Sequence, residues 1–118
     1  EDTIANLTRE ATLEEVFHNV LENACRHAPR GGRVVLSLDG AARPGWLRVE
    51  VRDQGPGFTQ EALERGFEPF FTRRRGGTGL GLAIVQRIVE EHQGRVTLGN
   101  GPTGGGVVTI DLPLAPAR

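Results

Sequence analysis

A glycine-rich stretch that leads directly into a helical pattern places the strongest constraint on this chain. The segment 73–94 reads RRRGGTGLGLAIVQRIVEEHQG and contains Gly76, Gly77, Gly79 and Gly81. Glycine tolerates positive φ and lets a ligand approach bare backbone. The start of the following helix offers unpaired N–H groups and a positive dipole end. The stretch therefore predicts either a phosphate-binding loop or a plain connector between two elements.

Length and composition predict one domain with a hydrophobic core, because the chain has 118 residues of ordinary globular composition. A net charge of −1 argues against general affinity for nucleic acid or anionic membranes. Cys25 is the single cysteine, which excludes an internal disulfide and fits a reducing, cytoplasmic compartment. Since the sequence contains no methionine, we expect it to be a piece of a longer protein.

The segment 12–27 has the pattern of an amphipathic helix. Thr12 and Glu15 have the spacing of a capping box, and Pro29 is expected to end the helix. Its apolar residues recur at helical spacing: Leu13, Val16, Phe17, Val20, Leu21 and Ala24. Residues 1–9 are polar, and we expect a frayed lead-in or the end of a linker.

A second face of this predicted helix carries Asn19, Asn23, Arg26 and His27. Asn19 and Asn23 are four positions apart, so their amides project from neighbouring turns. Asparagine is a mediocre helix former, and the pair indicates either a solvated surface or a site. In a site, an amide oxygen would bind hydrated Mg²⁺ on phosphates, and Arg26 would add positive charge.

Two strands are predicted at 33–39 and 46–52, joined by a loop at 40–45. Leu47, Val49 and Val51 share one face, and continued alternation places Asp53 on that apolar side. A carboxylate in such a position needs a partner. Asp53 therefore either opens the glycine-containing turn at 54–57 or accepts a hydrogen bond from the amine of a base.

The rest of the chain predicts a short helix at 59–64 capped by Thr59, and a helix ending near Gly94. Two further strands are expected at 95–98 and 107–112, followed by a disordered tail at 114–118. Between the helices, the aromatic cluster Gly66–Phe71 either packs in the core or anchors a mobile lid. The order of these elements predicts a two-layer α/β sandwich, with helices on one face of a mainly antiparallel sheet.

Four motifs, taken in order, resemble the catalytic ATP-binding domain of bacterial sensor histidine kinases, in the superfamily that includes gyrase B, Hsp90 and MutL. The segment 17–28 (FHNVLENACRHA) is similar to the N box, and 53–57 (DQGPG) to the first glycine box. The segments 66–71 (GFEPFF) and 77–82 (GTGLGL) resemble the F box and the second glycine box. The resemblance implies the Bergerat ATP-binding fold, with a mixed, mainly antiparallel sheet and about three helices on one face.

The resemblance also implies roles for residues at matching positions. Asn23 would bind the Mg²⁺ that bridges the phosphates, and Asn19 would help to position them, so that these two form the catalytic pair. Arg26 would contact phosphate, and His27 would lie near the adenosine. Asp53 would accept from the adenine amino group.

Further ligand contacts are implied for glycines and for the lid. Gly55 and Gly57 would give the base room, and the segment 58–77 would form an ATP lid that contributes Phe70. Backbone N–H groups at the phosphates would come from a continuous run: Gly77, Thr78, Gly79, Leu80 and Gly81. The arginines at 73–75 make this lid basic, and they would touch phosphate, meet a partner domain or only keep the lid solvated.

The implied activity is that of a protein histidine kinase in two-component signalling, with ATP and Mg²⁺ as ligands. The acceptor would be a histidine on a separate helical dimerisation domain of the parent protein, with a response regulator downstream. None of His18, His27 and His92 is followed by an acidic residue, as a phosphoacceptor would be. The parent is expected to be cytoplasmic or a membrane-bound sensor, of which this domain itself contacts neither membrane nor nucleic acid.

Two departures and two alternatives accompany the resemblance. Residues 1–10 show no strand before the N box, and Glu10 is a loose match to the acidic residue that usually begins its helix. Related ATPases carry a water-activating glutamate where this chain has Asn19, whose amide cannot act as a base. Asn19 also argues against an anti-sigma-type serine kinase, which stays an alternative, as does a nucleotide-binding scaffold without transfer activity.

Overall fold

The computed structural model describes residues 2–27, 30–40, 44–71, 81–102 and 104–114; for 2–12 and His27 it describes the backbone only. The elements follow the predicted order of helix, two strands, short helix, long helix and two strands. They are α1 (Asp2–His27), β1 (Val34–Asp39), β2 (Trp46–Asp53), α2 (Gln60–Arg65), α3 (Gly81–Glu91), β3 (Arg95–Asn100) and β4 (Gly106–Pro113).

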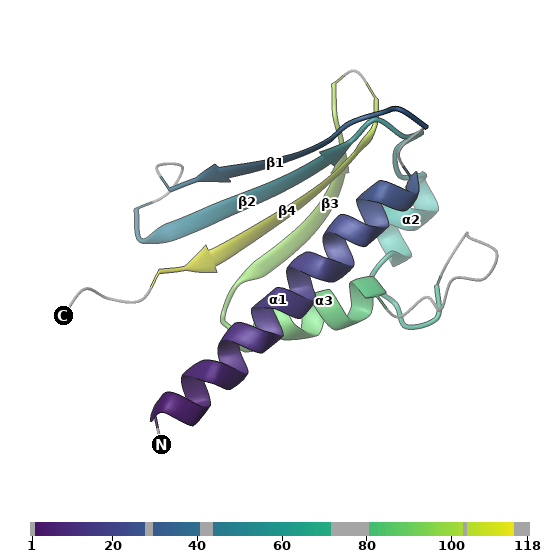
Figure 1. Ribbon diagram of the computed structural model, residues 1–118. Coiled ribbons are helices and arrows are strands. Elements are labelled where there is room, and N and C mark those ends of the chain that lie inside the picture. Colours follow the sequence, from purple (N-terminus) through teal and green to yellow (C-terminus); the bar gives the residue numbers. More distant parts are fainter. Residues whose placement is uncertain (1, 28–29, 41–43, 72–80, 103, 115–118) are drawn as a thin grey trace.

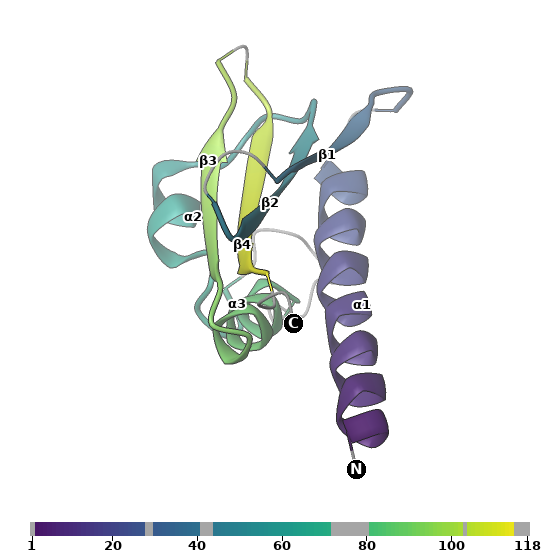
Figure 2. The same cartoon turned by 90° about the vertical axis from the view of Figure 1, so that its left-hand side faces the viewer.

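The four strands form one sheet in the order β1-β2-β4-β3, and all three pairings are antiparallel. The helices α1 and α3 lie along one face of this sheet (Figure 1), and the view turned by 90° shows α1 running beside the sheet and α3 near its lower end (Figure 2). The predicted two-layer α/β sandwich is therefore confirmed.

The core lies between the sheet and the two long helices. Val49 and Val51 of β2 stand opposite Ile110 and Val108 of β4, and these four side chains are buried. The helices contribute six more residues of the buried cluster, and β3 contributes one: Val16, Val20 and Ala24 from α1, Val85, Ile88 and Val89 from α3, and Val96 from β3. The alternating apolar residues of the strands and the helically spaced apolar residues of α1 and α3 thus pack together in one layer, as their spacing in the sequence indicates.

The other face of the sheet is polar. Arg48 stands opposite Asp111, and its Nε and Nη2 donate to the two carboxylate oxygens at 2.8 and 3.2 Å. The hydrogen bond to Asp111 raises the pKa of Arg48. This bidentate pair ties β2 to β4 on the side of the sheet away from the helices.

The first helix is longer than predicted, because α1 begins at Asp2 and not at Thr12. The predicted start of the helix is therefore wrong, and residues 2–9 are helical. Residues 2–11 contain neither glycine nor proline, and extending an existing helix adds one hydrogen bond for each residue that is ordered. The capping-box spacing at Thr12 consequently falls inside the helix and does not start it.

Other boundaries agree with the sequence to within a few residues. Thr59 caps α2, since its Oγ1 accepts from the Ala62 amide at 3.1 Å. The helix α3 ends at Glu91, after which Gln93 has a φ of 64° and Gly94 N–H donates to the Val89 carbonyl at 2.9 Å. Across the described residues, the helices include none with the length and apolar character needed to cross a membrane.

Candidate nucleotide-binding site

Three element ends that carry predicted site residues lie at the same end of the molecule (Figure 1). The helix α1 ends there at His27, β2 ends there at Asp53, and α3 begins there at Gly81. The fold thus brings the N box, the first glycine box and the end of the second glycine box towards one region. These segments are far apart in the sequence, and the packing of the helices on the sheet brings them close together.

Asn19 and Asn23 lie beside the core-facing stripe of α1. Both are half-buried, whereas Val16, Val20 and Ala24 on the stripe itself are fully buried. A half-buried amide can present its oxygen to a ligand while the helix backbone holds it rigidly. The position agrees with the predicted second face of the helix.

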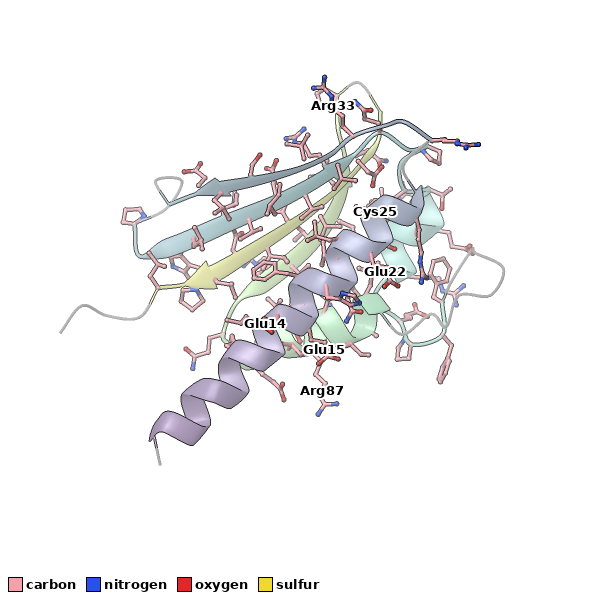
Figure 3. All side chains as sticks on the ribbon, in the orientation of Figure 1. Glu14, Glu15, Glu22, Cys25, Arg33 and Arg87 are labelled. Carbon is pink, nitrogen blue, oxygen red and sulfur yellow. The ribbon has the colours of Figure 1, made fainter. Side chains whose placement is uncertain are left out.

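Arg26 is engaged on its own helix. Its Nη2 lies 2.6 Å from Glu22 Oε1, and the other oxygen of Glu22 lies 3.2 Å from His18 Nε2. Glu22 follows Glu15 and precedes Cys25 along α1 (Figure 3). A phosphate would therefore compete with Glu22 for the guanidinium of Arg26. Glu22 was missed in the sequence, although its spacing of four from both His18 and Arg26 is the signal that finds it.

Asp53 ends β2 on the core-facing side, as predicted, since it stands directly opposite Val34 of β1 and is half-buried. Its Oδ1 accepts hydrogen bonds from the amide of Gly55 at 2.8 Å and from the amide of Gly106 at 3.1 Å. The two interpretations of Asp53 are thus compatible. Oδ1 closes the turn, and the hydrogen bonds of the described residues do not engage Oδ2, which a ligand could therefore use as an acceptor.

The glycines around Asp53 are required by close contacts. Gly57 has a φ of 82°, and a Cβ there would lie 2.7 Å from Asn100 Oδ1. A Cβ on Gly105 would collide with the Asp53 carbonyl oxygen, and one on Gly106 would lie 3.0 Å from Asp53 Oδ2. Gly105 and Gly106 belong to the β3–β4 hairpin, which the sequence did not connect with the site. The run of three glycines at 104–106 is the signal that was available.

The aromatic cluster is only partly packed in the core, and its role in a lid stays a prediction. Phe67 packs against the core, and Phe71 lies under the guanidinium of Arg65, 5.0 Å from the ring centre. Phe70 is 75% exposed and has a φ of 68°, which is unusual for a bulky residue. Its exposure leaves it accessible to a ligand or a partner, and its nucleotide contact stays a prediction.

Several predicted site residues lie outside the described residues. They are Gly77, Thr78, Gly79 and Leu80, the arginines at 73–75, and the side chain of His27. Gly81 is described as the first residue of α3. Among the described residues, a Cβ at Gly81 would meet nothing within 4 Å, so contacts within the fold do not require glycine there.

The described side chains include no group of three or more His, Cys, Asp or Glu that could enclose a metal ion. Among the described residues, the Asn19 and Asn23 amides of α1 carry neutral oxygen atoms, in addition to the carboxylates of Glu22 and Asp53. Mg²⁺ takes oxygen ligands and commonly keeps waters and phosphate oxygens in its shell. The donor set therefore fits an ion shared with a phosphate ligand.

Comparisons with known proteins agree with the fold. Residues 8–116 match the family described as histidine kinase-, DNA gyrase B- and HSP90-like ATPase. The signal transduction histidine-protein kinase BaeS of Escherichia coli K12 is 38% identical over 108 residues, which cover 86% of this chain and 23% of BaeS. The chain thus spans less than a quarter of that relative.

Two solved structures are similar in fold and sequence. The mycobacterial sensor histidine kinase MprB superposes with a TM-score of 0.81 at 35% identity, covering 91% of this chain and 73% of that structure. Full-length ShkA in complex with AMPPNP gives a TM-score of 0.79 at 34% identity, covering 92% of this chain and 23% of ShkA. Because residues 8–116 match this family and the solved histidine kinases share the sandwich, this chain belongs to the family of histidine kinase-, DNA gyrase B- and HSP90-like ATPases.

Proposed function

We propose that this chain is the ATP-binding catalytic domain of a sensor histidine kinase. It binds ATP with Mg²⁺ and presents the γ-phosphate to a histidine on a separate helical dimerisation domain. The phosphoryl group then passes to a response regulator. The family supports ATP binding, and the finer assignments follow from the residues of the site.

The observation that carries the proposal is the arrangement of the Asp53 carboxylate. Two backbone amides hold Oδ1, so the orientation of Oδ2 is fixed before a ligand arrives. A fixed, half-buried acceptor suits the amino group of adenine and repels the carbonyl oxygen of guanine. The complex of ShkA with AMPPNP, a relative 34% identical, supports an adenine nucleotide as the ligand.

The phosphates would lie towards the asparagine face of α1 and the start of α3. Asn23 would provide an amide oxygen to Mg²⁺, and Asn19 would hydrogen-bond and position the phosphates. A bound Mg²⁺ would neutralise charge on the β- and γ-phosphate oxygens. Backbone N–H groups at Gly81 would face the same phosphates, because the first turn of a helix leaves its N–H groups unpaired.

Transfer to a protein histidine is consistent with the amide of Asn19, which cannot act as a base. The imidazole nitrogen of the acceptor is itself the nucleophile: it forms a bond to the γ-phosphorus as the bond to the β–γ bridging oxygen breaks. ADP leaves, and the imidazole proton is released to solvent. Water would need activation by a base, which the neutral amide of Asn19 cannot supply.

The test has two arms. Isothermal titration of the 118-residue chain with MgATP is expected to show binding at a single site. Adding a histidine-bearing dimerisation domain from a similar kinase, with ATP labelled on the γ-phosphate, is expected to label that domain with an acid-labile phosphoryl group. An acid-stable label would indicate a serine kinase. Binding of MgATP without any transfer of label would indicate a nucleotide-binding scaffold. Steady ATP hydrolysis by the chain alone would contradict the argument from Asn19.

A further inference from the structure

We propose that Asn100, at the end of β3, is a positioning residue that fixes the base-binding turn and so sets the preference for adenine over guanine. Asn100 lies outside the four motifs of the nucleotide site. The inference rests on the proposed function, because Asn100 acts through the Asp53 segment and does not itself contact the base.

The side chain of Asn100 forms two hydrogen bonds to a single residue of the turn. Its Oδ1 accepts from the Phe58 amide at 2.7 Å, and its Nδ2 donates to the Phe58 carbonyl oxygen at 2.9 Å. The two residues are 42 positions apart. Because the amide group is planar, two simultaneous bonds fix both the distance and the orientation of the Phe58 peptide groups.

Gly57 shows how closely Asn100 approaches the turn. A Cβ at Gly57 would lie 2.7 Å from Asn100 Oδ1, and the φ of 82° there disfavours any residue with a side chain. Thus the Asn100 contact, as well as room for the base, requires a glycine at position 57. An alanine at Gly57 would push the Asn100 amide away from Phe58.

The same hairpin also holds the other end of the segment 53–58. Gly106, at the start of β4, donates to Asp53 Oδ1 at 3.1 Å, and Gly101 N–H donates to the Gly105 carbonyl at 3.0 Å within the hairpin turn. The β3–β4 hairpin therefore anchors the segment at Asp53 through Gly106 and at Phe58 through Asn100. Without Asn100, the Asp53 end stays anchored while the end at Phe58 loses its polar anchor.

We expect the fold to persist without the Asn100 side chain. The ring of Phe58 packs against the hydrophobic core, and the β3–β4 ladder extends over six residue pairs. Loss of the Asn100 amide therefore leaves Phe58 packed but lets its peptide groups rotate. The expected consequence is a base site that still binds a nucleotide and discriminates less well between bases.

The experiment compares the affinities of MgATP and MgGTP, which carry the same triphosphate. Titration calorimetry is run on the unmodified 118-residue chain and on Asn100→Ala, Asn100→Asp and the control Thr97→Ala, an exposed residue of the same strand. We expect Asn100→Ala to weaken ATP binding about fivefold to tenfold, as the loss of one to two hydrogen bonds does, with a smaller effect on GTP. Thr97→Ala is expected to leave both affinities unchanged.

Asn100→Asp provides a second test of the same role, which does not rely on the behaviour of the alanine variant. Its carboxylate keeps an acceptor for the Phe58 amide but replaces the donor to the Phe58 carbonyl by a second oxygen, so the ATP preference is again expected to fall. If the ratio of ATP affinity to GTP affinity is unchanged in both variants, including the case in which both affinities fall equally, the positioning role is overturned. An unmodified chain without preference for ATP would overturn the assignment of Asp53, and the role of Asn100 with it.

Discussion

The Gly106 amide donates a 3.1 Å hydrogen bond to Oδ1 of Asp53, a residue 53 positions earlier in the chain. The amide of Gly55 donates to the same oxygen at 2.8 Å. Backbone groups thus set the orientation of the carboxylate, and they occupy the oxygen that faces the turn. The contacts of Asp53 within the fold and its proposed contact with a ligand consequently involve different oxygen atoms.

Asp53→Asn is expected to separate these two kinds of contact. The amide oxygen can keep the bonds from Gly55 and Gly106, while the new NH₂ group faces the amino group of adenine, donor against donor. We expect ATP affinity to fall at least about tenfold, since an unsatisfied polar contact costs about 1–3 kcal/mol. Thermal denaturation is expected to shift by only a few degrees. ATP affinity equal to that of the unmodified chain would sink the adenine assignment.

Asp53→Ala serves as the comparison, because it removes both oxygens. It is expected to lose ATP binding and also to melt at a lower temperature than Asp53→Asn, since the amides of Gly55 and Gly106 lose their acceptor. Equal melting temperatures for the two variants would show that the bonds to Oδ1 contribute nothing to folding.

Gly105→Ala is expected to destabilise the fold. Gly105 has a φ of 82°, and a Cβ there would collide with the carbonyl oxygen of Asp53. Strained backbone of this kind costs about 1–3 kcal/mol, to which the collision adds. The matched control is Gly40→Ala, where a Cβ would meet nothing within 4 Å and φ is not positive. Urea denaturation measures the free energy of unfolding of both variants. A decrease for Gly105→Ala no larger than for Gly40→Ala would contradict the close contact between Gly105 and Asp53.

Local periodicity predicted most of the fold and part of the site. The alternation of Leu47, Val49 and Val51 placed Asp53 on the core-facing side, and the asparagine spacing placed Asn19 and Asn23 together on α1. Each of these predictions depends on one element, whose geometry fixes the direction of its side chains. The start of α1 was placed wrongly because a local capping signal cannot show that a helix continues through it.

Contacts between distant segments were not predictable in this way. Asn100 meets Phe58, and Gly106 meets Asp53, only because β3, β4 and β2 are brought together in the order of the sheet. A single sequence contains no local pattern that joins such positions. The pairing of Arg26 with Glu22 is the opposite case, since its spacing of four was visible in the sequence.

Gly81→Ala is expected to weaken ATP binding without lowering the stability of the fold. Among the described residues, a Cβ at Gly81 would meet nothing within 4 Å, and alanine favours a helix over glycine by up to about 1 kcal/mol. We therefore expect unchanged or slightly higher stability. ATP affinity is expected to fall, because a methyl group would stand where phosphate approaches the first turn of α3. Retained affinity in titration calorimetry would remove Gly81 from the phosphate site.

Asn23→Ala is expected to weaken only the Mg²⁺-dependent part of ATP binding. The amide oxygen of Asn23 is the proposed ligand of Mg²⁺, so its removal loses nothing when the metal is chelated. Titrations of ATP with excess Mg²⁺ and with EDTA measure the two parts, and we expect about a tenfold loss in the first and little change in the second. Asn19→Ala is the control on the same face, expected to weaken binding under both conditions because the Asn19 amide is proposed to contact phosphate directly. If Asn23→Ala lost affinity equally with and without Mg²⁺, the metal would have to be held elsewhere, and Asn23 would be a phosphate contact like Asn19.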